Sequence, residues 1–276
     1  VKHMSNVINV NPEEYVVNAM PVYDWNANIY ITSFSKKGMI KRTKLSNFKV
    51  QRYSKSINMM NLKKDDKVID VTYSTDTNVL IVTKKGYGLW YNINEVNPVG
   101  VKAAGVKAIN LREDEVVSGI IFNKEDNDFI TILTDKGTAK RMRFSDIDMG
   151  SRGNRGLMFM KEIKSNPSKV VKVYVTNPKN KIVVVSKDYT KEIKLTEIPI
   201  MDRYSNGSYI IKDKIIDSYL EKELLTKDDF ATLEYIEDKK PEQSQLNFDM
   251  LNKESLKQVD DKMVIINNFL DNVEGK

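Results

Sequence analysis

The chain of 276 residues contains no cysteine and a single histidine. The absence of cysteine excludes disulfides, thiolate zinc sites and cysteine nucleophiles, and it fits a reducing compartment. The histidine, His3, lies in a VKHM leader typical of a cloning remnant, so no Ser-His catalytic arrangement is expected. The glycines never take the spacing of a Walker loop or a dinucleotide fingerprint, which argues against nucleotide hydrolysis.

Long hydrophobic runs are also missing. No stretch approaches the roughly 20 apolar residues of a membrane span, and no secretory leader opens the chain. The acidic clusters Asp65-Asp66 and Glu113-Asp114-Glu115 are expected to be solvated turn residues rather than metal ligands. We therefore predict a cytoplasmic, non-catalytic chain with no catalytic site, metal or cofactor of its own.

Charge is divided unevenly along the chain. Residues 213–276 carry 9 Lys and 16 Asp or Glu, a net charge of −7, whereas the preceding part carries +13. Clustered Lys and Arg favour a polyanionic partner, because binding releases counterions from a phosphate backbone. The alternative is a solvated surface that is merely rich in lysine.

One pattern recurs four times: a turn, a β-rich run and an apolar-polar-polar-apolar quartet. The quartets start at residues 45, 93, 144 and 195, in steps of 48, 51 and 51 residues. The runs on either side of each turn are rich in Val, Ile, Thr, Tyr and Phe, which is typical of β-hairpins. The turns are Lys36-Lys37-Gly38, Lys84-Lys85-Gly86, Asp135-Lys136-Gly137 and Lys187-Asp188-Tyr189, the last without glycine.

A further run precedes each hairpin, beginning with Tyr15-Val16-Val17, and another follows each quartet, beginning with INMMNL. Four short strands per unit of about 50 residues indicate blades around an axis. We predict an all-β, propeller-like β-pinwheel of four to five four-stranded blades, with Trp25 and Trp90 in blade cores or interfaces. Base stacking is the alternative role for Trp90. The predicted parts are a leader (1–12), the pinwheel (13–217) and an acidic, partly flexible tail (218–276) that is a candidate to complete a fifth blade from Ile215-Ile216.

Basic residues recur in the hairpins. Strand alternation places Arg42 with Lys44, and Arg141 with Arg143, on one face, and the turn lysines crown the same blade edge. One positive rim would offer duplex DNA a curved track whose contacts offset a bending cost of about a few kcal/mol. The alternative is that these charges keep sheet edges soluble. The predicted DNA-binding residues are Lys36, Lys37, Lys41, Arg42, Lys44, Arg52, Lys55, Lys84, Lys85, Lys102, Lys136, Lys140, Arg141, Arg143, Arg152 and Arg155.

The repeat length, the Gly-x-x-Lys-Arg strands (38–42 and 137–141) and the Leu-Ser-Asn-Phe type of quartet resemble the C-terminal β-pinwheel domain of bacterial type IIA topoisomerase A subunits. The resemblance covers roughly residues 13–212. It implies blades that exchange strands and a basic outer perimeter that binds and bends duplex DNA. It also implies a catalytic tyrosine outside this chain, two partners in the form of a breakage-reunion domain and a B subunit, and ATP and Mg used only by the parent enzyme.

The gyrase branch carries a Gln-Arg-Arg-Gly-Gly-Lys-Gly loop that this chain does not contain intact. The nearest stretches are QRYSKS (51–56), GSRGNRG (150–156) and VGVKAAG (99–105). This favours the topoisomerase IV branch over DNA gyrase, with SRGNRG predicted to let backbone amides and two arginines approach phosphates.

Two alternatives stay open at this point. One is a gyrase-type wrapping domain. The other is a propeller that binds protein partners instead of DNA through Met59, Met60, Met158, Met160 and Tyr53, although such methionines are more often strand core. The domain itself is expected to be monomeric.

Overall fold

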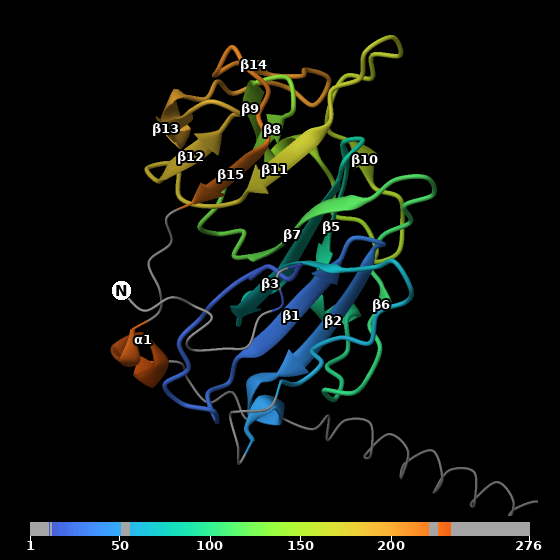
Figure 1. Cartoon of the computed structure of the whole chain (residues 1–276), viewed down its shortest axis with the longest axis vertical. Coiled ribbons are helices and arrows are strands. Elements are labelled where there is room, and N and C mark those ends of the chain that lie inside the picture. The colour runs from blue at the N-terminus through green and yellow to red at the C-terminus, as the bar shows by residue number, and fades with distance from the viewer. Residues whose placement is uncertain (1–10, 12, 51–55, 221–225, 233–276) are drawn as a thin grey trace, which may run out of the picture. The chain divides into compact units, whose positions relative to one another are not determined.

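The computed structural model describes residue 11 and residues 13–50, 56–220 and 226–232. Four antiparallel hairpins form the framework of this part of the chain (Figure 1). Arg52, Lys55 and Tyr53 lie outside the described residues. The hairpin strands are β1 (Tyr30–Ser35), β2 (Met39–Lys44), β4 (Asn78–Thr83), β5 (Tyr87–Asn92), β8 (Phe129–Thr134), β9 (Thr138–Arg143), β12 (Lys181–Val185) and β13 (Thr190–Lys194).

Each hairpin receives one further strand from the next repeat. The run that precedes a hairpin in sequence pairs with the first strand of the hairpin before it, and not with its own. These strands are β3 (Val68–Ser74), β7 (Val116–Phe122), β11 (Val170–Tyr174) and β15 (Asp217–Leu220).

The run that follows a quartet is exchanged in the same direction. It forms a two-residue strand on the outer edge of the preceding hairpin, so each of the first three sheets combines two repeats. These strands are β6 (Val106–Lys107), β10 (Leu157–Met158) and β14 (Ser208–Tyr209). We number the sheets as blades 1 to 4; the strand orders are β3-β1-β2-β6, β10-β5-β4-β7, β11-β8-β9-β14 and β13-β12-β15.

The all-β, four-blade, propeller-like architecture confirms the predicted fold class, and three of the four sheets have the expected four strands. The prediction of a fifth blade beginning at Ile215-Ile216 is wrong for the described residues, because β15 completes blade 4. Tyr15-Val16-Val17 and the INMMNL run form no strands, since the described chain contains no earlier hairpin to receive them.

The structure explains the apolar-polar-polar-apolar order of the quartets. Each forms a single 3-10 turn whose first and last residues are buried, as in η2 (Leu45–Phe48). The middle two residues face outward, so the apolar-polar-polar-apolar order fits a turn that is packed on one side only. The other three turns are η3 (Ile93–Glu95), η4 (Phe144–Asp146) and η5 (Leu195–Glu197).

The core lies between successive blades. Phe34 and Ile40 of blade 1 pack against Ile81 and Tyr91 of blade 2, and similar clusters join blades 2 to 3 and 3 to 4. All six residues of β4 are buried, as expected for a strand covered on both faces. Trp90 reaches across to Phe144 with 5.2 Å between ring centroids, so it belongs to a blade interface as predicted.

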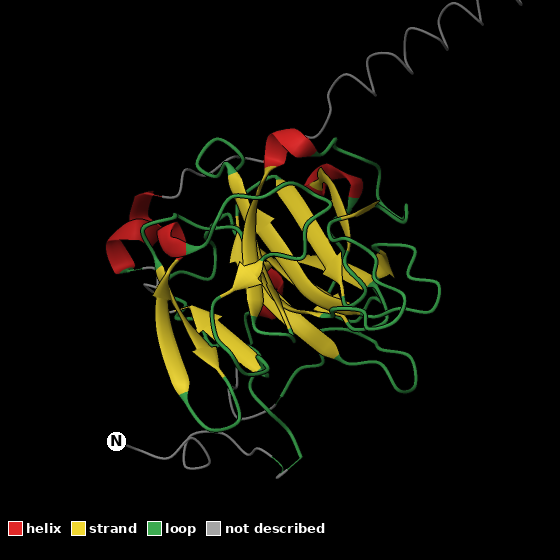
Figure 2. Cartoon of the chain, turned by 90° about the horizontal axis from the view of Figure 1, so that it is seen from above, coloured by secondary structure: helices red, strands yellow, loops and turns green. Residues whose placement is uncertain are grey.

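The exchanged strands define an inside and an outside. β3 contacts β7, β7 contacts β11, and β11 contacts β15, which places these four strands on the inner side of their sheets. β6, β10 and β14 lie at the opposite edges, so the second strand of each hairpin faces the periphery. Figure 2 shows that strands make up most of the regular structure and are joined by long loops.

The face of blade 1 that does not pack against blade 2 is covered in part by a short helix. Phe230 of the short helix α1 (Lys227–Thr232) is buried against it and lies 5.4 Å from the ring of Tyr23. Among the described residues no helix is both long and apolar enough to cross a membrane.

Close packing between blades predicts a sensitive position at Gly119 in β7. A Cβ atom there would lie 2.2 Å from the ring of Phe34, whereas one at Gly100 would meet nothing within 4 Å. We expect Gly119→Ala to lower the free energy of unfolding by about 1–3 kcal/mol through overpacking, measured by urea denaturation. Gly100→Ala is the control and should stay within about 0.5 kcal/mol of the wild type. Equal stability of the two variants would contradict the packing of blades 1 and 2.

Candidate nucleic-acid interface

The structure divides the described candidate cations into three groups. The turn set lies at the hairpin turns and consists of Lys36, Lys37, Lys84, Lys85 and Lys136. The outer-edge set lies on the second hairpin strands and on the loops that cover them, and consists of Arg42, Lys44, Lys102, Arg141, Arg143, Arg152 and Arg155. The third group, Lys41 and Lys140, is interior.

Acidic residues hold the turns of blades 1 and 2 in place. The amide of Lys37 donates to Oδ1 of Asp66 at 2.9 Å, and the amide of Lys85 donates to Oδ1 of Asp114 at 3.2 Å. The glycines of the first three turns have positive φ, as at Gly38 (84°). The acidic clusters therefore fix turn geometry, and the described residues contain no group of three His, Asp or Glu that could hold a metal.

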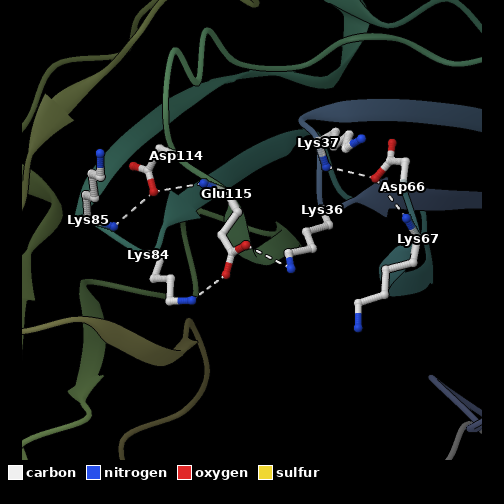
Figure 3. A network of polar contacts seen from close by, with 8 residues as sticks. All are labelled: Lys36, Lys37, Asp66, Lys67, Lys84, Lys85, Asp114 and Glu115. Carbon is white, nitrogen blue, oxygen red and sulfur yellow. Dashed lines mark hydrogen bonds and ion pairs between the residues drawn. The ribbon is translucent and has the colours of Figure 1, made fainter. Parts of the chain in front are cut away.

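A carboxylate joins the turns of blades 1 and 2 (Figure 3). Glu115 lies 2.8 Å from the ammonium of Lys36 and 2.6 Å from that of Lys84. Hydrogen bonds from Lys36 and then Lys84 lower the pKa of Glu115, and Glu115 in turn raises the pKa of Lys36. Two cations of the turn set thus share one anion, which reduces the charge that they offer to a phosphate.

The prediction that Lys41 and Lys140 belong to the DNA-binding rim is wrong. Each is 1% exposed, and both point their ammonium groups at backbone carbonyls of the adjoining loops. Lys41 donates to the carbonyls of Met59 and Val101, and Lys140 donates to three carbonyls of residues 202–205 at 2.7–3.1 Å. These lysines fasten the outer loops and cannot reach a phosphate, because the loops cover them.

The outer loops pack tightly on the second hairpin strands. Their amides bond to strand carbonyls, as from Val99 to Arg42 at 2.9 Å and from Gly150 to Trp90 at 2.8 Å. A Cβ atom at Gly156 would lie 2.2 Å from the carbonyl oxygen of Gly88, so glycine is required where the loop ends. Equivalent close approaches occur at Gly105 and Gly207.

This packing changes the interpretation of GSRGNRG. The amide of Gly153 donates to the carbonyl of Ala108 at 3.0 Å, and the amide of Arg152 donates to the carboxylate of Glu95 at 2.7 Å. The amides of Gly150 and Asn154 are also bonded within the chain. The amides of Arg152, Gly153 and Asn154 are therefore engaged within the chain and are not available to phosphates, so this part of the loop offers its side chains instead.

The arginines of the outer edge are held against the protein. Arg42 lies over Tyr30 at 3.9 Å, Arg155 over Tyr87 at 4.0 Å and Arg141 over Phe129 at 5.1 Å. Arg141 also donates to the carbonyl of Ile198, and Arg152 to those of Glu95 and Lys107. In blade 2 the position of Arg42 is taken by Trp90, whose indole donates to Asn78 at 3.0 Å.

Other predicted cations are more open to solvent. Lys102 and Arg143 are exposed, and Lys44 is half-buried on the same strand face as Arg42. Sequence reasoning missed Lys107 in β6 and Arg203, whose guanidinium lies 4.7 Å from the ring of Tyr204. The signal that could have found them is the register of the outer loops, which follows the three glycines named above.

The geometry can be compared with known proteins. Residues 30–73, 77–124 and 128–177 match the family described as DNA gyrase C-terminal domain, beta-propeller. The chain belongs to this family. The crystal structure of the C-terminal domain of DNA topoisomerase IV is similar at 34% identity, with a TM-score of 0.76 over 79% of this chain and 70% of that one. The DNA gyrase A C-terminal domain shares the fold at 20% identity, with a TM-score of 0.67 over 79% of this chain and 74% of that one.

The curated relatives agree with the structural neighbours. The A subunit of DNA topoisomerase 4 from Bacillus subtilis is 39% identical over 77% of this chain and 27% of its own length. Its counterpart from Staphylococcus aureus is 30% identical over 79% of this chain and 28% of its own length. The resemblance to type IIA topoisomerase A subunits, with topoisomerase IV preferred over gyrase, is confirmed. The chain spans little more than a quarter of these relatives.

The buried ammonium of Lys140 generates a prediction about pH. Burial lowers its pKa to about 8, below the ordinary value, so the folded state loses this proton before the unfolded state does as pH rises. Stability contributed by this site therefore rises with pH above about 8. We expect the wild type to gain about 2 kcal/mol relative to Lys140→Met between pH 7.5 and 9.5, measured by urea denaturation.

The control is Lys179→Met, which removes a solvent-exposed ammonium; its difference from the wild type should not change over the same range. A difference between the wild type and Lys140→Met that does not change with pH would contradict the prediction, and would mean that the three carbonyl acceptors hold the charged form strongly enough to cancel the effect of burial.

Proposed function

We propose that this domain binds duplex DNA along its outer edge, bends it, and does so without sequence preference. The observation that carries the proposal is the recurrence of outer-edge cations in successive blades. Blade 1 presents Arg42 and Lys102, the loop over blade 2 presents Arg155, and blade 3 presents Arg141 and Arg143.

The stacked arginines support this function physically. A guanidinium held over an aromatic ring loses little further freedom when it meets a phosphate, so less of the binding energy is spent on ordering. Contacts to phosphates position a duplex but carry no sequence information directly. Cations spaced over several blades would favour a duplex that curves to meet them, with the contacts offsetting a bending cost of about a few kcal/mol.

The names of the relatives extend the proposal to the whole protein. We infer that the parent is the A subunit of a bacterial topoisomerase IV, an ATP-dependent type IIA isomerase that decatenates DNA and relaxes supercoils in the cytoplasm. The catalytic tyrosine, the breakage-reunion domain and the B subunit lie outside this chain. ATP and Mg serve the holoenzyme and not this domain, which acts as a non-catalytic, monomeric unit directing duplex segments.

The salt dependence of binding tests the outer-edge assignment. We expect Lys102→Gln/Arg143→Gln to weaken duplex binding by a similar factor on unrelated sequences. The negative slope of log K against log salt should become shallower by about two, because two phosphate contacts are lost. Both side chains are exposed, so the fold should be unaffected. Fluorescence anisotropy with labelled duplexes from 50 to 300 mM salt measures the change.

The matched control is Lys179→Gln/Lys187→Gln, which removes the same charge from exposed lysines of blade 4 outside the predicted set. An equal loss in this control would assign binding to net charge rather than to the outer edge. No salt-sensitive binding by the wild type would favour the protein-binding alternative, against which stands the burial of Met60 and Met160.

A further inference from the structure

A pocket of about 440 Å³ opens on blade 2, between its hairpin turn and the loop that follows β10. Such a volume lies within the range of small-molecule sites. Apolar side chains of Met158, Met160, Ile163 and Pro167 line part of it, together with the ring of Tyr87. This part of the lining suits a flat, weakly polar group.

The remaining lining is strongly cationic. Five basic residues face one carboxylate, that of Glu162. The basic residues are Lys85, Arg155, Lys161, Lys164 and Lys169. An apolar lining beside an excess of positive charge is the combination required by a ligand that carries both a ring and a phosphate.

Arg155 is positioned in the pocket lining by a stack on Tyr87. Its guanidinium lies over the ring of Tyr87 at 4.0 Å, and its Nε is buried without a hydrogen-bond acceptor in the described chain. A buried donor without an acceptor is destabilising, and more so when it is charged. The side chain as a whole is half-buried, so an anion in the pocket would meet the rest of the guanidinium rather than the buried Nε.

The stack is specific to blade 2 among the described repeats. The register of the outer strands aligns Arg155 with Ala104 and Asn206, and Tyr87 with Met39 and Thr138. Neither of the other pairs can form a cation–aromatic stack. A neighbouring pocket of about 260 Å³ shares Lys85 and Arg155 but includes Glu113 and Asp114, which disfavour an anion.

We propose that the blade 2 pocket binds a single nucleotide, with the base against the methionines and the phosphate at Arg155 and the lysines. The ligand is either a free nucleoside monophosphate or an unpaired nucleotide of a DNA strand. This goes beyond binding of a regular duplex, because paired and stacked bases cannot enter a pocket. The free-nucleotide source does not depend on the duplex-binding function proposed above.

Isothermal titration calorimetry with adenosine monophosphate tests the pocket. We expect saturable binding of the monophosphate. Adenosine and inorganic phosphate should each bind at least 10-fold less tightly, since each provides only half of the ligand. Arg155→Met should weaken the monophosphate at least 10-fold, and Arg155→Lys should weaken it less, because charge remains without the planar stack. Lys179→Met is the matched control and should bind like the wild type.

Three outcomes would overturn the proposal: no binding of the monophosphate, equal affinity for adenosine, or an equal loss in Lys179→Met. Unfolding curves of both Arg155 variants establish that the fold is retained, and Tyr87→Leu provides a second variant that should also lose at least 10-fold.

A second arm separates the two sources of the nucleotide. Duplexes that differ by one unpaired adenine are compared at equal length and salt. A preference of at least 3-fold for the bulged duplex, lost in Arg155→Met, identifies a DNA strand as the source. Equal affinities together with monophosphate binding identify the free nucleotide. Failure of both duplexes to bind would refute the duplex-binding proposal while leaving the calorimetric result standing.

Discussion

The fold depends on the need of every hairpin for hydrogen-bonding partners on both edges. An uncovered strand edge leaves backbone amides and carbonyls unpaired and invites association with other chains. In blades 1 to 3 the next repeat supplies both covers, an inner strand and a short outer strand with its loop, whereas the described part of blade 4 has the inner strand β15 alone. The same exchange brings successive blades together and buries the clusters between them. Pairing and packing are thus satisfied by one topological device.

The outer loop is the place where this device meets function. It must lie close against the second hairpin strand, and glycine permits that approach at its end. It must also be fastened, and the chain does this in two ways. In blades 1 and 3 a buried lysine of the strand donates to the loop carbonyls. Over blade 2, Arg152 of the loop donates instead to the carbonyls of Glu95 and Lys107. Positive charge in this protein is therefore partly structural, which a count of basic residues conceals.

Local chemistry made much of the fold predictable. Turn glycines and alternating β-rich runs defined the hairpins, and the buried ends of each quartet follow from its apolar positions. Strand exchange had no local signature, because a run between two hairpins is equally distant from both. Strand exchange was implied only by the resemblance to a known family. The expectation of a fifth blade did not apply it to the run at Ile215-Ile216, whose strand β15 pairs with the preceding hairpin.

The candidate site was less predictable for a related reason. Alternation separates Lys41 from Arg42 but does not say that a loop from the next repeat covers one of them. Leu89 stands in the same register as Lys41 and Lys140 and was the available hint that this position is buried. The stack of Arg155 on Tyr87 joins residues 68 positions apart in sequence, which only the strand exchange brings together.

The direction of strand exchange also sets an order on biosynthesis. A hairpin that leaves the ribosome has neither of its lateral partners until the following repeat has been translated. Nascent blades must therefore wait with exposed edges, and each is completed one repeat late. Blade closure should therefore trail elongation from the N-terminal end, one repeat at a time.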